Sequence, residues 1–182
     1  HRAIDFLSRS FSPSGGIPTY PSDAEIRFFT GATSETDFSG WTSPHICVTA
    51  NVANLQAFKD DIRLKNFLLS SRNSDRSWSG YWWADQAYPT MLASRAVQDQ
   101  QMIPVHTDSA FDLACCLRSD ATVLDQLISF QQEDGGWPAS ARLRVPAPFV
   151  KDPERISSRI SLDQNRIYTT ATAILSCNEF TD

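Results

Sequence analysis

Three segments of the chain repeat one arrangement of residues at a spacing of about sixty. They read AIDFLSRSFSPSGGI, KNFLLSSRNSDRSW and LDQLISFQQEDGGW, and each is an apolar stretch, a Gly/Ser/Asp-rich turn and a bulky residue ten positions after a leucine. The leucines are Leu7, Leu68 and Leu127, and the bulky residues are Ile17, Trp78 and Trp137. A fixed period is typical of architectures in which one helical unit stacks on the next. We therefore predict three helix-pair units.

Each unit continues into a second helix that is rich in small residues. The stretch after Pro44, HICVTANVANLQAF, has apolar residues at helical spacing, and so does IYTTATAILSC near the end of the chain. The bulky residue precedes a threonine of this helix by 32, 12 and 33 residues; the threonines are Thr49, Thr90 and Thr170. Small residues on all sides predict burial of both helix faces, so that the units stack into a curved array.

The prediction from these patterns is one all-α domain over residues 1–182, with units at roughly 1–60, 61–118 and 119–182. It contains seven helices, one of them over residues 106–118, between the second and third units. Residues 21–41 and 139–165 are predicted to be irregular loops, because the second stretch contains three prolines. Trp78 and Trp137 are predicted to wedge between units, where truncation to alanine costs about 3–5 kcal/mol.

Composition excludes several classes of protein. The chain of 182 residues is 41% hydrophobic and has a formal net charge of −5, which argues against a nucleic-acid partner, because such a partner requires a clustered basic face. We find neither a transmembrane segment nor a signal peptide in the sequence. Four cysteines without CxxC spacing are interpreted as reduced packing residues, and a cytoplasmic location fits them best.

The sequence resembles the squalene cyclase and protein prenyltransferase repeat superfamily. The resemblance rests on QQEDGGW over residues 131–137, on NSDRSWSGYWW, on SPSGGIPTY and on the small-residue helices. It implies an α/α toroid, here a partial α/α barrel, around an apolar cavity for terpenoid or lipid-like ligands. The QW-type structural residues that it implies are Gln131, Gly135, Gly136, Trp137 and Trp78.

The chain departs from that family at the residues that perform chemistry. HICVTA stands where an acidic DxDD-type motif is expected, and we find no DDxxD magnesium cluster or zinc trio. His106, Asp108, Asp112 and Cys115 lie at helical intervals, but a solvated helix face explains them better than a metal does. We therefore expect no metal and no cofactor.

Aromatic residues supply the candidate cavity. The stretch YWWADQAYPT is the densest aromatic segment, and aromatic faces stabilise a carbocation where water is excluded. The alternative is that these rings pack the turn against the next helix. The candidate cavity residues are Trp41, Trp82, Trp83, Tyr88 and Phe111.

Two residues are candidate general acids, and two are candidate anion ligands. Asp85 lies ahead of a helix, where it can either protonate a substrate or cap the helix. His45 lies at a helix start, near the position expected for the family's acid. Arg142 and Arg144 can bind a diphosphate or carboxylate, or can pin their loop to nearby acids.

Two functional hypotheses follow. In the first, the chain is a terpene-cyclase-like domain that encloses an apolar isoprenoid-like molecule and contributes to class II-type carbocation cyclisation. In the second, it is a non-catalytic lipid-binding or assembly module. A half-ring exposes an apolar edge, so a homodimer, or a second domain or subunit, is expected to complete it.

Overall fold

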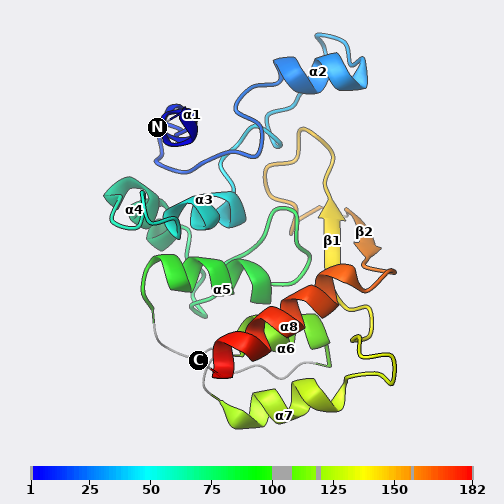
Figure 1. Cartoon of the computed structure of the whole chain (residues 1–182). Coiled ribbons are helices and arrows are strands. Elements are labelled where there is room, and N and C mark those ends of the chain that lie inside the picture. The colour runs from blue at the N-terminus through cyan, green and yellow to red at the C-terminus, as the bar shows by residue number, and fades with distance from the viewer. Residues whose placement is uncertain (1, 100–107, 118–119, 157, 182) are drawn as a thin grey trace.

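The computed structural model describes residues 2–99, 108–117, 120–156 and 158–181. Eight helices and two strands lie in these residues (Figure 1). The helices are α1 (Arg2–Arg9), α2 (Ala24–Thr30), α3 (Ile46–Ala53), α4 (Ile62–Ser70), α5 (Ala87–Ala96), α6 (Ala110–Cys116), α7 (Ala121–Ser129) and α8 (Ile167–Thr181). The strands are β1 (Arg142–Val145) and β2 (Arg159–Leu162).

The predicted all-α toroid class is wrong, because the chain also contains a sheet. Strands β1 and β2 pair antiparallel, with Arg142 opposite Leu162 and Val145 opposite Arg159. Both strands lie within residues 139–165, which were predicted to be a loop. The prolines on which that prediction rested lie between the strands, where they do not interrupt the ladder. The second predicted loop, 21–41, contains α2.

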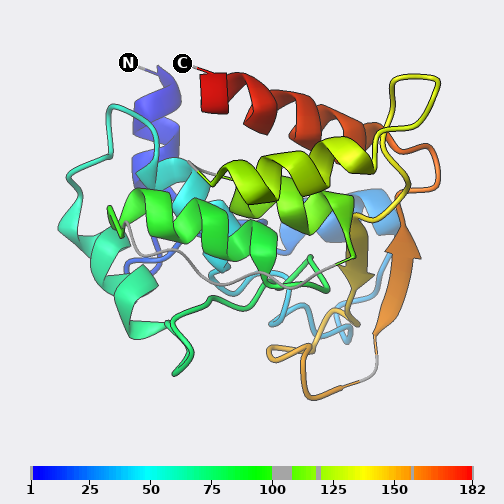
Figure 2. The ribbon, with the colours of Figure 1, turned by 90° about the horizontal axis from the view of Figure 1, so that it is seen from below.

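Four helices form a continuous row. Helix α3 packs on α5, α5 on α6 and α6 on α8, while α4 and α7 cover α3 and α6 respectively. Figure 1 shows this row between α1 near one end of the molecule and α7 at the other, and Figure 2 shows the same row from below. The predicted unit boundaries within this row stay a prediction.

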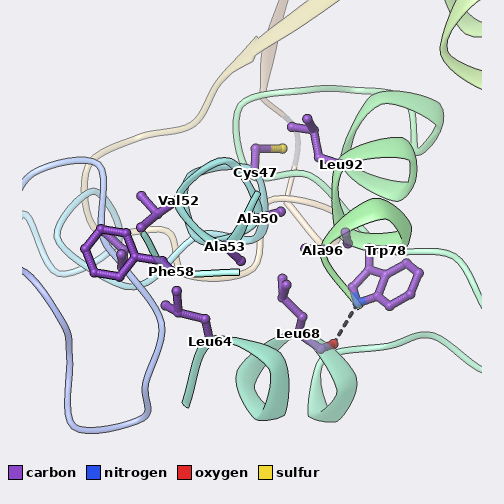
Figure 3. Close-up of a cluster of buried hydrophobic side chains, with 12 residues drawn as sticks. Cys47, Ala50, Val52, Ala53, Phe58, Leu64, Leu68, Trp78, Leu92 and Ala96 are labelled. Atoms are coloured by element: carbon purple, nitrogen blue, oxygen red, sulfur yellow. Dashed lines mark hydrogen bonds between the residues drawn. The ribbon is translucent and has the colours of Figure 1, made fainter. Parts of the chain in front are cut away.

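The core consists of two main clusters of apolar side chains. The first joins α3, α4 and α5 and includes Leu64, Leu68 and Trp78, which are fully buried (Figure 3). The second joins α6, α7 and α8 around Leu127 and Trp137. Burial of such side chains is the main driving force for folding, so the two clusters hold the row of helices together.

The three repeated turns have the same hydrogen bonds. In each turn a backbone N–H donates to the carbonyl four residues later: Ser12 to Gly16, Asn73 to Ser77 and Gln132 to Gly136, at 2.8–3.0 Å. The residue before each acceptor has a positive φ; these residues are Gly15, Arg76 and Gly135. The sequence register therefore corresponds to a repeated backbone structure.

The residue after each turn is bound in the same way. The backbone N–H groups of Ile17, Trp78 and Trp137 donate to the hydroxyls of Thr49, Thr90 and Thr170, at 2.8, 2.9 and 3.2 Å. The two indoles also donate from Nε1 to Leu68 O and Leu127 O, both at 2.7 Å. Trp78 is 0% exposed and Trp137 is 4% exposed, so the predicted burial of both tryptophans is confirmed.

Candidate functional site

The aromatic segment beside α5 is attached to the sheet. Ala84 N–H donates to Arg142 O at 3.0 Å, and Arg144 N–H donates to Trp82 O at 2.8 Å, so the segment runs along β1 like a short third strand. Successive residues of an extended segment point to opposite faces. Trp82 and Trp83 therefore belong to two different groups of side chains.

Trp82 lies in a group that we call the histidine cluster: Thr19, Trp41, His45, Tyr81 and Trp82. Trp82 Nε1 donates to Thr19 Oγ1 at 2.8 Å, and that hydroxyl is 2.8 Å from His45 Nδ1. His45 Nε2 is 3.0 Å from Gly40 O; because a carbonyl only accepts, Nε2 carries the proton and Nδ1 accepts from Thr19. Burial lowers the pKa of His45 to about 4, against the smaller effect of the Gly40 contact.

The loop between the strands covers the histidine cluster. Trp41 Nε1 donates to Pro146 O at 3.1 Å, and Tyr81 Oη donates to Val150 O at 2.6 Å. The His45 and Tyr81 rings stack with centroids 3.9 Å apart. Every polar atom in this set of contacts has a partner, and the imidazole is neutral at physiological pH. This arrangement favours a structural role for His45.

Trp83 lies in a second group, which we call the Trp83 stack: Trp83, Tyr88 and Phe111. The Trp83 and Phe111 rings are stacked, with centroids 5.1 Å apart and planes at 13°, and Tyr88 lies 4.5 Å from Trp83. Phe111 is buried, whereas Trp83 and Tyr88 are half-buried. The stack is therefore partly exposed at Trp83 and Tyr88 and covered at Phe111.

Asp112 follows Phe111 in α6 and forms, with Asp85 and Arg142, what we call the carboxylate cluster. Arg142 Nη1 lies 2.9 Å from Asp85 Oδ1. Asp112 Oδ1 is buried and has no hydrogen-bond partner among the described residues. Burial, and next the charge of Asp85, raise the pKa of Asp112 to about 6, while Ser109 and Arg142 oppose the shift.

Arg144 lies two residues beyond Arg142 in β1 and is only 8% exposed. Its Nη2 donates to Ala84 O at 3.2 Å, whereas its buried Nη1 has no partner among the described residues. The side chain lines a cavity of about 360 Å³, together with Pro153, Glu154, Arg155, Ile156, Ser158 and Ile160. A buried guanidinium with a free donor is a site where an oxyanion can bind.

The structure brings some of the predicted site residues together and separates others. Trp83, Tyr88 and Phe111 form one stack, while Trp41 and Trp82 surround His45 instead. Asp85 pairs with Arg142, so these two predictions meet at one site. Of the four residues that were weighed as metal ligands and set aside, His106 lies outside the described residues.

Sequence reasoning assigned Asp112 to a solvated face and so missed the carboxylate cluster. A signal was present in α6 itself, because AFDLACC has one charged residue among six apolar ones. Such a helix buries most of its surface, and a lone carboxyl on it is partly desolvated. Within the described ranges no group of three or more metal-capable side chains occurs, and no helix there is long and apolar enough to cross a membrane.

Known structures similar to this chain include several of one type II terpene cyclase, MstE. A variant of the type II terpene cyclase MstE from Scytonema, in complex with geranylgeranyl dihydroxybenzoate (substrate), matches with a TM-score of 0.81 and 30% identity over 98% of this chain and 66% of that one. Another MstE variant, in complex with merosterolic acid A (product), matches with a TM-score of 0.80 and 29% identity, over 98% of this chain and 65% of that one. A protein from Actinoplanes matches with a TM-score of 0.82 and 25% identity, over 98% of this chain and 68% of that one.

The chain therefore has a terpene-cyclase-like fold, and it covers 65–66% of the length of these two MstE structures. No family model matches the chain, and the search of curated proteins gives no match. The resemblance found in the sequence is supported at the level of terpene cyclases; the squalene cyclase and prenyltransferase repeat superfamily is not confirmed.

Proposed function

We propose that this chain contributes to class II-type cyclisation of an apolar isoprenoid, with Asp112 as the general acid. The observation that carries the proposal is the Asp112 carboxyl, whose buried Oδ1 has no partner in the described part of the chain and whose pKa is raised to about 6. The likeness in fold to type II terpene cyclases supports the same reaction class.

An alkene is a very weak base, so its protonation requires an undissociated acid in a water-poor site. Burial, and next the charge of Asp85, favour the neutral carboxyl of Asp112, so a larger fraction of it is protonated than of an ordinary aspartate. The acid proton goes to one alkene carbon and leaves a carbocation at the other. Arg142, held by Asp85, favours the carboxylate that remains on Asp112 after the transfer.

The Trp83 stack is proposed to stabilise the cation. Cations are attracted to the negative face of an aromatic ring, and the attraction strengthens where water is excluded. Trp83 and Tyr88 belong to the segment that also contains Asp85, and Phe111 precedes Asp112 in α6. The same two elements therefore carry the acid cluster and the aromatic rings.

The test is incubation with geranylgeranyl diphosphate, farnesyl diphosphate, squalene and geranylgeranyl dihydroxybenzoate, with product analysis by mass spectrometry. We expect a cyclised product of unchanged mass, which Asp112→Asn abolishes. Asp108→Asn is the matched control, because Asp108 is an exposed aspartate ahead of the same helix. Loss of product in both variants, or in neither, contradicts the role given to Asp112.

The alternative function is a non-catalytic isoprenoid-binding or assembly module. It predicts that no substrate is turned over, and that a ligand which raises the melting temperature of the wild type does so equally in Asp112→Asn. Ligand binding adds stability by mass action and requires no acid, so this outcome separates binding from catalysis.

Arg144 is proposed to bind the oxyanion of an amphiphilic substrate. Its free Nη1 supplies a charged donor, and Ile156 and Ile160, both half-exposed, supply apolar surface in the same cavity. A carboxylate or phosphate joined to an apolar group fits this combination. The substrate in the MstE complex, geranylgeranyl dihydroxybenzoate, combines an isoprenoid with a benzoate, which supports the proposal by analogy.

Binding at Arg144 is tested by calorimetric titration with geranylgeranyl diphosphate and with geranylgeraniol, which lacks the anion. We expect Arg144→Gln to weaken binding of the diphosphate about tenfold or more and to leave binding of the alcohol unchanged. Arg159→Gln is the control, because Arg159 is an exposed arginine in the same hairpin. An equal loss in both variants reduces the effect to net charge and overturns the assignment.

A further inference from the structure

Two helices of the chain share one pattern of contact residues. In the register of the repeat, Arg2, Phe6 and Leu7 of α1 correspond to Arg63, Phe67 and Leu68 of α4, since each pair is 61 residues apart. Helix α7 has threonine and glutamine at the positions of the arginine and phenylalanine. The RxxxFL pattern is thus common to α1 and α4 alone among the three first helices.

In α4 this pattern covers the first turn. A Cβ added to Gly15 would lie 2.7 Å from Arg63 O, and one added to Gly16 would lie 2.6 Å from Phe67 Cε2. A larger residue at Gly15 would collide with the α4 backbone, and one at Gly16 with the Phe67 ring and with Pro44. The two glycines of the first turn are therefore required by the helix that packs on them.

The third turn has the same glycines and no such helix. A Cβ on Gly135 would meet nothing within 4 Å among the described residues. One on Gly136 would lie 3.3 Å from Arg166 Nη1 and 3.4 Å from Asp134 Oδ1 and Thr170 Oγ1, and these side chains would have to shift slightly. The φ of Gly136 is not positive, so its backbone does not require glycine. The second turn has Arg76 and Ser77 in place of the two glycines. Among the described residues no ring is set against Gly136 as Phe67 is set against Gly16.

The surface beside the third turn is apolar and open. A groove of about 510 Å³ runs along it, lined by Gly135, Gly136, Ile167, Ala171 and Ile174 among others. In the register set by the threonines, Ala171 and Ile174 correspond to Ala50 and Ala53 of α3, which are 0% and 2% exposed. Ile174 is 48% exposed, because nothing in the described chain covers α8 as α4 and α5 cover α3.

Helix α1 has the complementary exposure. None of its residues is buried, and Phe6, the counterpart of Phe67, is 58% exposed. Glu133 is an exposed acid beside the third turn, opposite in charge to Arg2. Figure 1 shows α1 well apart from α8, so α1 does not cover its own α8.

We propose that α1 of a second copy of this chain packs on the third turn and α8, as α4 packs on the first turn and α3. Phe6 then contacts Gly136 in the way that Phe67 contacts Gly16. The contact is heterologous, because one copy contributes its first helix and the other its last. It does not depend on the reaction proposed for Asp112.

The test is the association state, measured by sedimentation equilibrium over a range of protein concentrations. We expect the wild type to self-associate, and Phe6→Ala and Gly136→Leu each to raise the dissociation constant about tenfold or more. Phe28→Ala is the matched control, because Phe28 is an 82% exposed phenylalanine on α2, away from both surfaces. We expect it to associate like the wild type.

Mixing the two variants identifies the geometry. Phe6→Ala retains an intact third turn, and Gly136→Leu retains an intact α1, so an equimolar mixture has one complete contact and forms a dimer that neither variant forms alone. Circular dichroism and melting temperature establish that both variants are folded. A monomeric wild type at all concentrations, or variants that do not complement each other, overturns the proposal; the first result leaves the groove to a helix of a different partner.

Discussion

The histidine cluster and the carboxylate cluster lie beside neighbouring tryptophans, Trp82 and Trp83. They differ in whether their buried polar atoms have hydrogen-bond partners. Around His45, each ring nitrogen has a partner and the loop between β1 and β2 closes the group. Around Asp112, one buried carboxyl oxygen has none in the described residues. Leaving a buried polar atom unpaired costs stability, so such an atom is expected where function requires it.

Burial disfavours the charged form of both groups, but protonation has opposite consequences. Burial lowers the pKa of His45 to about 4 and raises the pKa of Asp112 to about 6. Neutral His45 can only accept a proton from solvent, whereas neutral Asp112 can donate one. An aromatic surrounding is common to both groups and does not distinguish them, so the proposed site rests on the unpaired acid.

The largest expected effect is on turnover. Asp112→Asn should lower the rate of cyclisation by about 10²–10⁴-fold, because it removes the acid and keeps its shape. His45→Gln should leave the rate of the folded fraction unchanged. The wild-type rate should fall about tenfold per pH unit above pH 6, as Asp112 loses its proton. Equal losses in the two variants, measured by product formation, would erase the distinction between the clusters.

The next effect is on stability as a function of pH. The folded-state pKa of His45 lies below its unfolded value of 6.5, so its contribution falls by about 3 kcal/mol as the pH drops from 6.5 through 4. The folded-state pKa of Asp112 lies above its unfolded value, so its protonation adds stability between about pH 6 and 4. The two contributions oppose each other in the wild type.

Asp112→Asn removes one of these opposing contributions. Urea unfolding should therefore show a steeper loss of stability below pH 6.5 in this variant than in the wild type, and greater stability at pH 8, where the desolvated charge is gone. Asp108→Asn serves as the control and should follow the wild-type curve. A variant curve parallel to that of the wild type would mean that burial does not raise the pKa of Asp112.

A smaller effect is expected at Thr19, which links the two rings of the histidine cluster. Thr19→Val keeps the shape and removes the hydroxyl, so His45 Nδ1 and Trp82 Nε1 both lose their partner. We expect a loss of about 2 kcal/mol in the free energy of unfolding, measured with urea at pH 8. Thr33→Val is the matched control, because Thr33 is an exposed threonine. A loss no greater than that of the control would show that water replaces the hydroxyl and that the cluster is not sealed.

The sequence predicted what depends on local pattern. The leucine-to-tryptophan register led to the buried indoles of Trp78 and Trp137 because both positions face a helix end at a fixed distance along the chain. It failed where distant segments meet. The pairing of β1 with the Trp82–Asp85 segment joins residues about 60 apart. The pairing of β1 with β2 joins residues 14 to 20 apart, and prolines between them concealed the two short strands RLRV and RISL.

The same limit explains which site residues were found. The aromatic segment was conspicuous in composition, but its split into two groups depends on the extended backbone beside β1. The environment of Asp112 depends on Asp85 and Arg142, which come from other elements. A pattern along one helix cannot reveal a charge supplied by another part of the chain.

The smallest expected effect separates the two tryptophans themselves. Trp82→Phe removes the Nε1 donor to Thr19 and should cost about 1 kcal/mol beyond the lost ring area. Trp83→Phe removes no hydrogen bond found among the described residues, so its cost should come from ring area alone. Unfolding in urea at pH 8 measures both. The two changes delete the same atoms, so the difference between their losses in free energy of unfolding reports the hydrogen bond of Trp82. A larger loss for Trp83→Phe would contradict the view that the closed, hydrogen-bonded cluster is the one around Trp82.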